Sequence, residues 1–155
     1  MLTQLKKLSI STEGRYAQES ELQFFHDYLK TVNARIGVYE TIRDEQEQID
    51  SQITLIAQSI DPKIHYRGDR NIANICRRDR QQALRCASAA MLFDDLDRLR
   101  NDYLMWDQKI IKAFADSKPA QITYQVMFKV IETMIKPEEL TLIAPALKIT
   151  QMCLN

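Results

Sequence analysis

The sequence is poor in the residues that interrupt helices: of 155 residues, three are glycine and four are proline. Because turns depend heavily on these two residue types, their scarcity predicts long helices and argues against many short strands. No run of about 18 apolar residues occurs, so no segment is expected to span a membrane. The N-terminal stretch MLTQLKKLSIS lacks the apolar core of a signal peptide. It is expected to form a short amphipathic helix with Leu2, Leu5 and Leu8 on one face.

Charge and cysteine content narrow the class of protein further. The 21 basic and 21 acidic residues balance, so the net charge predicts no general affinity for nucleic acid or for an anionic membrane. Three cysteines, an odd number without the spacing of a disulfide framework, indicate a reducing compartment. We therefore expect an intracellular chain that folds as a single domain over residues 1–155.

Apolar residues recur at helical spacing along most of the chain, and no useful strand-type alternation appears. Ser117 is expected to cap a helix, Pro137 to open the last one, and Pro145 to kink or shorten it. The pattern predicts seven or eight helices, which is an all-α, globin-like helical bundle with an N-terminal helical arm at residues 1–18. Beyond the arm, helices are predicted over about residues 20–60, 70–93, 99–114, 117–134 and 137–152.

A heme globin would need a proximal histidine on the helix that follows the acidic corner FDDLD. Residues 91–116 contain no histidine, and His26 and His65 are the only two in the chain. His65 lies in a predicted loop and is expected to be solvated. The sequence therefore excludes heme ligation by histidine in the usual place.

The stretch ICRRDRQQALRC, residues 75–86, seats a thiol and a carboxylate among arginines. Cys76 and Asp79 are three residues apart, so on a helix they share a face, and the small Ala83 leaves room beside them. Arg77 and Arg78 would favour the reactive thiolate form of Cys76. A nucleophilic sulfur, a carboxylate and cations suit a linear tetrapyrrole, which offers a ring for a thioether, pyrrole N–H groups and two propionates.

Simpler explanations of the same residues stay open. Cys76 can be a small apolar residue on the core face of its helix, and Asp79 and Arg80 can be ordinary surface charges. The basic stripe between Lys63 and Arg85 could contact phosphates. Apart from Tyr66 it contains no aromatic residue for base stacking, so no nucleic-acid partner is predicted.

The segment CRRDRQQALR resembles the chromophore-helix signature of the phycobiliprotein family, Cys-x-Arg-Asp followed by Leu-Arg, with the second arginine nine residues after the cysteine. The similarity continues into Ala90-Met91-Leu92 and Asp95, where it looks most like the β-type allophycocyanin chain. Upstream, Gly14-Arg15-Tyr16 resembles the family element that joins the arm to the globin-like body. The resemblance spans nearly the whole chain.

The resemblance implies a bound cofactor, a linear tetrapyrrole (phycocyanobilin-type bilin). Cys76 would form the thioether to ring A, Asp79 would accept hydrogen bonds from the central pyrrole nitrogens, and Arg78 would pair with a propionate. Arg85 corresponds to a family arginine that meets an aspartate on the arm of a partner chain. The chain is accordingly expected to form homo- or hetero-oligomers with phycobiliprotein-like chains.

The sequence departs from the family pattern mainly at assembly surfaces. Ser11 stands where the family has the partner aspartate, and Phe93-Asp94-Asp95 replaces the usual Ala-Gly-Asp corner. Pro145 interrupts the last helix. The bilin anchor is retained while these surfaces differ. This combination indicates an atypical family member rather than a subunit of the bulk antenna.

The predicted function is light absorption and energy transfer in or near the phycobilisome, or light-linked regulation, without enzymatic turnover. A chromophore-free helical interaction module and a noncovalent bilin carrier are the alternatives. The expected location is the cytoplasm or the cytoplasmic face of the thylakoid membrane. No enzyme is predicted, because the sequence lacks a Ser-His-Asp arrangement, a metal-ligand cluster and a phosphate-binding glycine loop. The FDDLD carboxylates are expected to form a helix-start cap and a solvated face.

Overall fold

The computed structural model describes residues 1–114 and 117–154, and most of these residues are helical. The prediction of an all-α, globin-like fold is confirmed. Between the third and fourth helices lies a small antiparallel hairpin of strands β1 (Tyr66–Arg67) and β2 (Arg70–Asn71). The helices are α1 (Leu2–Ser11), α2 (Glu19–Asp44), α3 (Gln46–Ile60), α4 (Ala73–Leu92), α5 (Leu96–Arg98), the π-helical turn η1 (Leu99–Leu104), α6 (Met105–Ala113), α7 (Ser117–Met134) and α8 (Pro137–Cys153).

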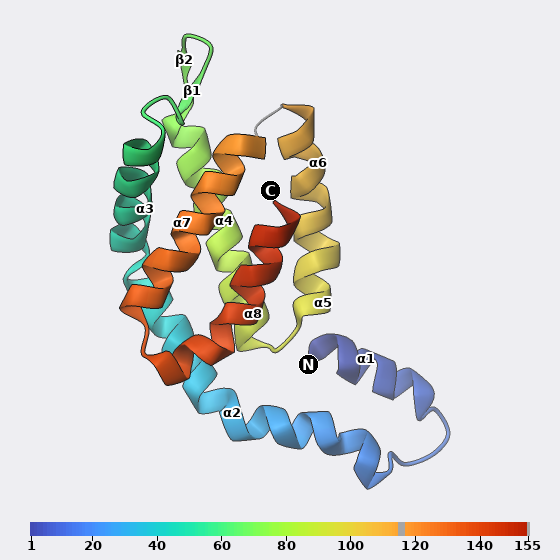
Figure 1. The fold of residues 1–155 in the computed structure, drawn as a ribbon. Helices are drawn as coiled ribbons and strands as arrows, with labels where there is room; N and C mark the ends of the chain where they lie inside the picture. The colour runs from blue at the N-terminus through green and yellow to red at the C-terminus, as the bar shows by residue number, and fades with distance from the viewer. Residues whose placement is uncertain (115–116, 155) are drawn as a thin grey trace.

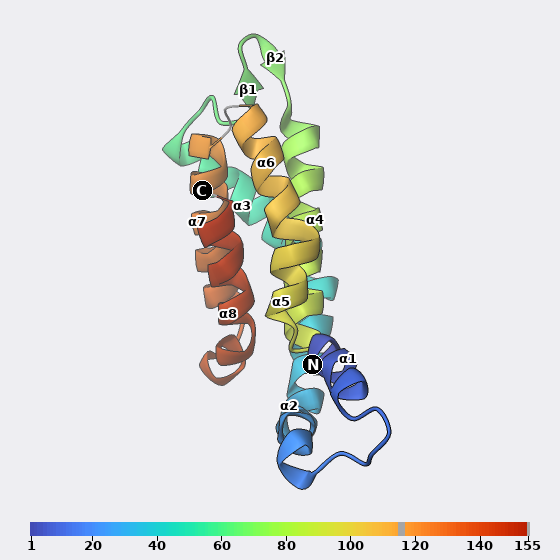
Figure 2. The same cartoon turned by 90° about the vertical axis from the view of Figure 1, so that its right-hand side faces the viewer.

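Helix α4 runs through the body and packs against α2, α8 and η1, while α7 packs against both α3 and α8. The hairpin projects from one end of the body, and α1 with the first turns of α2 lies at the opposite end (Figure 1). Seen from the side, α7 and α8 lie on one side of the body, and α4 lies with α5 and α6 on the other (Figure 2).

The core is made by apolar residues that recur at helical spacing and so face inward from each helix. Helices α3, α7 and α8 supply most of the largest buried side chains, and α2, α4 and η1 contribute one each. These fully buried apolar residues are Val38, Ile49, Ile53, Met91, Leu104, Met127, Ile131, Ile143 and Leu147, and Leu154, directly after α8, is fully buried as well.

The predicted continuous helix over residues 20–60 is wrong. The helix ends at Asp44, and a new one begins at Gln46 after Glu45, whose backbone (φ −92°, ψ 6°) leaves helical geometry. Ile42 and Ile49, on either side of this break, are both buried. The change of direction therefore lets α3 reach α7 while both isoleucines face the core. Four apolar residues that recur at helical spacing along this stretch are exposed: Leu29, Ile36, Ile56 and Ile60.

Helix α4 starts at Ala73 rather than at the predicted Arg70, because residues 66–71 form the hairpin. Gly68 makes its turn with a φ of +60°, a conformation that favours glycine. The prediction that His65 is solvated is also wrong. Its side chain is buried beneath the hairpin, with Nδ1 3.3 Å from Nε2 of Gln58. Burial lowers the pKa of this imidazole.

The corner between α4 and α5 is made without glycine. Asp94 takes the left-handed conformation, with a φ of 49°, that glycine usually supplies at such a turn. The next residue, Asp95, caps α5 by accepting a hydrogen bond from the backbone of Arg98 at 3.3 Å. The predicted cap is thus confirmed, but the predicted solvated face is wrong for Asp95, which is buried.

Asp95 also fastens the N-terminal arm to the body. The backbone N–H and the hydroxyl of Thr3 donate to its two carboxylate oxygens, each at 2.7 Å. The amino group of Met1 donates to the backbone carbonyl of Asp94. Leu2, Leu5 and Leu8 are half-buried by this arrangement.

The two C-terminal helices follow the sequence prediction in part. Pro137 is the first residue of α8, as predicted, but Pro145 does not shorten the helix, which continues to Cys153. The predicted cap, Ser117, is the first residue of α7 and not the residue that precedes the helix. The position before Ser117 lies outside the described residues. In the described part of the chain, no helix combines the length and the apolar character needed to cross a bilayer.

Candidate functional site

A cleft of about 520 Å³ opens between α4, the hairpin and helices α6 and α7. This volume is within the range of small-molecule binding sites, roughly 300–1,000 Å³. Its walls are largely apolar and aromatic. The residues that supply this apolar lining include Ile64, Ile72, Ile75, Trp106, Ile110, Ile111, Phe114 and Ala120.

Cys76, Arg78 and Asp79, the three site residues singled out in the sequence, all line this cleft. Cys76 and Asp79 are half-buried, one turn apart on α4. The side chain of Arg78 is 74% exposed, and its Nε and Nη2 each lie 3.2 Å from Oδ1 of Asp79. The cleft therefore offers a half-buried thiol, a half-buried carboxylate and an exposed cation. Ala83, expected to border it, lies in the core instead.

Two other arginines of the motif, Arg77 and Arg80, face helix α3. Arg80 is buried and donates from Nε to Oδ1 of Asp50 at 2.7 Å, and from Nη2 to the hydroxyl of Thr54 at 2.8 Å. Arg77 pairs with Oδ2 of Asp50 at 3.0 Å and also with Glu47. The alternative that Arg80 is a surface charge is therefore wrong, because this side chain joins α4 to α3.

Three of the polar residues that line the cleft were not singled out by the sequence analysis. Tyr103, Asp107 and Tyr124 line it from η1, α6 and α7. The Tyr103 hydroxyl donates to Oδ2 of Asp107 at 3.3 Å. Burial raises the pKa of Asp107, Tyr103 counteracts this by its hydrogen bond, and the charge of Asp79 raises it further. The spacing of four between Tyr103 and Asp107 is the one signal in the sequence that could have suggested this pair.

The rim of the cleft is aromatic. Trp106 and Phe114, which recur at helical spacing with Ile110 in the sequence, are 64% and 56% exposed. The guanidinium of Arg67, on the hairpin, lies 4.5 Å from the centre of the Phe114 ring, within cation–π range. This contact joins the hairpin to the end of α6, and both residues line the cleft.

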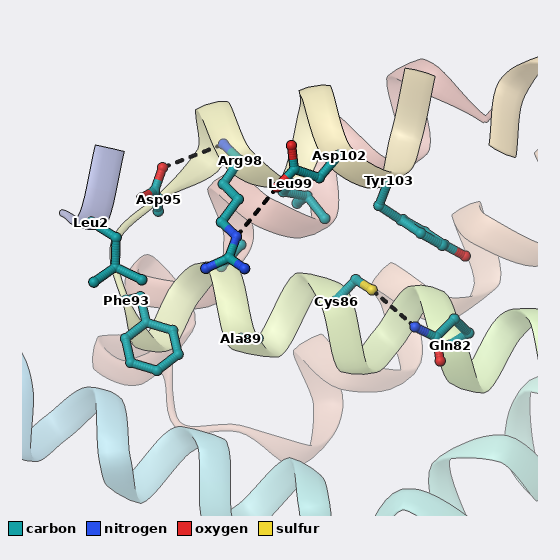
Figure 3. Close-up of a pocket in the computed structure, with 11 residues that line it drawn as sticks. Leu2, Gln82, Cys86, Ala89, Phe93, Asp95, Arg98, Leu99, Asp102 and Tyr103 are labelled. Atoms are coloured by element: carbon teal, nitrogen blue, oxygen red, sulfur yellow. Dashed lines mark hydrogen bonds and ion pairs between the residues drawn. The ribbon is translucent and has the colours of Figure 1, made fainter. Parts of the chain in front are cut away.

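A second groove, of about 430 Å³ and drawn in Figure 3, shares Tyr103 with the cleft. Cys86 of α4 and Phe93, which directly follows α4, line one side of it, Asp102 and Tyr103 of η1 line the other, and the arm contributes Leu2. Cys86 accepts a hydrogen bond from Nε2 of Gln82 at 3.3 Å, which Figure 3 shows. Burial raises the pKa of this thiol, so it stays protonated and weakly nucleophilic.

All three cysteines are thiols, because Cys76, Cys86 and Cys153 form no disulfide. Cys153, near the end of α8, is half-buried against the core. Among residues 1–114 and 117–154, no group of histidine, cysteine, aspartate and glutamate side chains is placed to hold a metal ion. Cys76 is thus the one cysteine that lines the cleft with the apolar walls.

Comparison with known proteins assigns the chain to a family. No curated protein sequence matches it significantly. A family model described as phycobilisome protein matches residues 8–152, from the last turn of α1 almost to the end of α8. Members of this family have a globin-like all-α fold and are light-harvesting proteins, not enzymes, that typically bind linear tetrapyrroles. The chain belongs to the phycobilisome protein family.

Proposed function

We propose that this protein binds a linear tetrapyrrole in the cleft between α4, α6 and α7, with Cys76 as the covalent anchor. The observation that carries the proposal is that Cys76, Arg78 and Asp79 line the same cleft. In this proposal the sulfur of Cys76 forms a thioether with ring A. Asp79 accepts hydrogen bonds from the central pyrrole N–H groups, and Arg78 pairs with a propionate.

The chemistry of the cleft suits such a ligand. Apolar and aromatic side chains on α6 and α7 match the flat pyrrole rings, and a half-buried carboxylate matches their N–H groups. Arg78 is largely exposed, so the propionates it pairs with would lie at the mouth of the cleft. A bidentate guanidinium–carboxylate contact would fix their orientation.

The role that follows is light absorption with energy transfer in or near the phycobilisome, or light-linked regulation. In this role the pigment supplies the photochemistry when bound, and the protein sets its shape and electrostatic surroundings. We place residues 1–155 in one functional domain, with residues 1–18 as an arm for association with phycobiliprotein-like chains.

Co-expression with bilin-synthesis enzymes and a suitable lyase tests the covalent anchor. After denaturation, a zinc-fluorescence gel should show a bright band for the wild type and none for Cys76→Ala. Cys86→Ala is the matched control, because this half-buried thiol lies on the same helix but in the second groove. It should stay bright. Equal absence of fluorescence in the wild type and in Cys76→Ala would rule out covalent attachment.

A chromophore-free interaction module is the second candidate. Four apolar side chains are exposed on the arm and on α2: Ile10, Tyr16, Leu29 and Ile36. Exposed apolar side chains on an extended arm favour contact with another chain. A colourless protein purified from its native host together with a specific partner would favour this candidate over pigment binding.

A further inference from the structure

The cleft contains a second carboxyl group besides that of Asp79. Asp107, on α6, is only 8% exposed although it lines the cleft. Its hydrogen bond from the Tyr103 hydroxyl is long, at 3.3 Å. None of the ion pairs between described residues includes Asp107. Burying a carboxyl group with so few hydrogen-bond partners costs free energy. A ligand that donates hydrogen bonds to the group would offset this cost.

The two carboxyl groups act on the same part of the cleft. The charge of Asp79 disfavours a second charge on Asp107. Burial raises the pKa of Tyr124, and Asp107 and then Asp79 raise it further, so this phenol lies within reach of both fields. Two acids from different helices and two phenols therefore line the same cleft.

The cations of the cleft have a different distribution. Arg78 lies at the mouth with its side chain mostly in solvent. Arg80 is 3% exposed and its charge is matched by Asp50, yet its Nη1 has no hydrogen-bond partner among the described residues. The cleft thus presents one buried acid, Asp107, and one half-exposed acid, Asp79, whereas its other arginines, Arg67, Arg70 and Arg78, are exposed. This division suits a ligand with N–H groups at its centre and carboxylates at its edge.

We propose that Asp107 is a second acceptor for the ligand's N–H groups, so that a protonated linear tetrapyrrole is held between carboxyl groups on α4 and α6. This inference rests on the proposed function and adds a positioning residue from outside the α4 motif. A protonated tetrapyrrole carries hydrogen on all four nitrogens and one positive charge. Asp79 and Asp107 together stabilise that charge, and binding in turn relieves the repulsion between them.

Asp107→Asn tests the role, since it keeps the size of the side chain and removes its charge. Asp102→Asn is the matched control, because Asp102 lies five residues earlier, is exposed, and pairs with Arg98 outside the cleft. Each purified apoprotein is titrated with biliverdin to measure affinity. Each chain loaded with pigment on Cys76 is then titrated with acid and base, and the absorbance reports the pH at which the pigment loses its proton.

Asp107→Asn should weaken biliverdin binding by about tenfold or more, the effect of losing one hydrogen bond to a charged group. It should also lower the pH at which the loaded pigment deprotonates by about one unit, because the protonated form loses an anionic neighbour. The zinc-fluorescent band on Cys76 should remain. Asp102→Asn should match the wild type in all three measurements.

Wild-type affinity and an unchanged spectral titration in Asp107→Asn would overturn the role of Asp107 while leaving the Cys76 anchor in place. Loss of the zinc-fluorescent band from wild-type protein, with biliverdin still bound, would instead overturn the covalent anchor and keep Asp107. A wild-type chain that takes up no pigment by either route would contradict the proposed function and the role of Asp107 together.

Discussion

At the scale of single residues, Asp50 is the electrostatic centre of the contact between α3 and α4. It is 5% exposed and accepts from Arg80 at 2.7 Å and from Arg77 at 3.0 Å. Arg77 is half-exposed and can turn toward solvent, but Arg80 cannot, because its side chain is enclosed. The stability of this contact therefore depends on Asp50 staying charged and present.

Asp50→Ala should lower the free energy of unfolding by about 3–5 kcal/mol, because it leaves the Arg80 guanidinium buried without a counter-charge. Urea denaturation followed by circular dichroism measures this change. Asp44→Ala is the control, since Asp44 forms an exposed pair with Arg43 and such pairs are worth about 0–1 kcal/mol. A loss below about 1 kcal/mol for Asp50→Ala would contradict the prediction.

Asp107 should make the apoprotein less stable as the pH rises. Burial raises the pKa of Asp107 in the folded state, so the folded chain holds this proton more tightly than the unfolded chain, where the pKa is about 3.9. Stability from this group is complete below about pH 4 and is lost as the pH rises through the higher folded value. Asp107→Asn removes that dependence and should be more stable than the wild type at pH 8.

Urea unfolding of both apoproteins across a pH series measures the difference between them. Asp102→Asn should follow the wild-type curve at every pH, because Asp102 is exposed. If Asp107→Asn were less stable than the wild type at pH 8, the carboxylate would have to be stabilised by its surroundings, and the prediction would fail.

At the scale of secondary-structure elements, the arm helix α1 depends on a small number of contacts at the corner between α4 and α5. Burial raises the pKa of Asp95, but the backbone and hydroxyl hydrogen bonds from Thr3 and the N-terminal ammonium outweigh this, and the net pKa is lowered. Stability from this contact is therefore full above the unfolded pKa of about 3.9 and is lost as the pH falls through the lower folded value. Acid should release the arm.

Thr3→Val should loosen α1 without unfolding the body, because it removes the hydroxyl bond to Asp95 and keeps the shape of the side chain. The loss of a hydrogen bond to a carboxylate is worth about 1.5–3 kcal/mol, so tryptic cleavage at Arg15 should be about tenfold faster or more. Ser9→Ala, which removes an exposed bond to the Lys6 carbonyl, should leave the rate unchanged. Equal cleavage rates for all three chains would show that Thr3 does not hold the arm.

The sequence predicts features within one helix better than features that depend on how helices meet. Cys76, Arg78 and Asp79 are placed together by spacing within α4, so their shared cleft was accessible to sequence analysis. Asp107 reaches the same cleft from α6, after the π-helical turn η1 has shifted the register of the following residues. The same shift explains why Trp106 and Phe114, in step with an ideal helical stripe, lie at the rim rather than in the core.

At the scale of the whole molecule, the fold class follows from composition and periodicity, but the break at Glu45 does not. No glycine or proline marks that break, since Gly37 lies inside α2 and the next proline is Pro62. It follows from packing, because α3 must turn to cover α7. The sequence likewise does not predict which apolar residues of α2 are buried. Leu29 and Ile36 follow the helical apolar pattern, yet both are exposed.

The exposed apolar residues of the arm and α2 predict association. Tyr16 is 97% exposed, and Ile10, Leu29 and Ile36 are also exposed. Sedimentation velocity of the purified chain should show a species larger than a monomer, alone or with a phycobiliprotein-like partner. The double change Tyr16→Ser and Leu29→Asn should weaken association, so that the protein concentration needed to form the larger species rises by an order of magnitude.

Met152→Gln is the control for this experiment, because Met152 is exposed on α8, far along the chain from the arm. It should not alter the sedimentation profile. A wild-type chain that stays monomeric at high concentration, both alone and with such a partner, would show that the arm has no binding role.

Tyr103 and Gln82 line both the cleft and the second groove, so the two hollows share a partition only one side chain thick. A neighbour docked in the groove would therefore contact side chains that also line the cleft. The colour of a linear tetrapyrrole depends on the planarity of its rings, so if the cleft holds the proposed pigment, such a neighbour would shift the absorption maximum without touching the pigment.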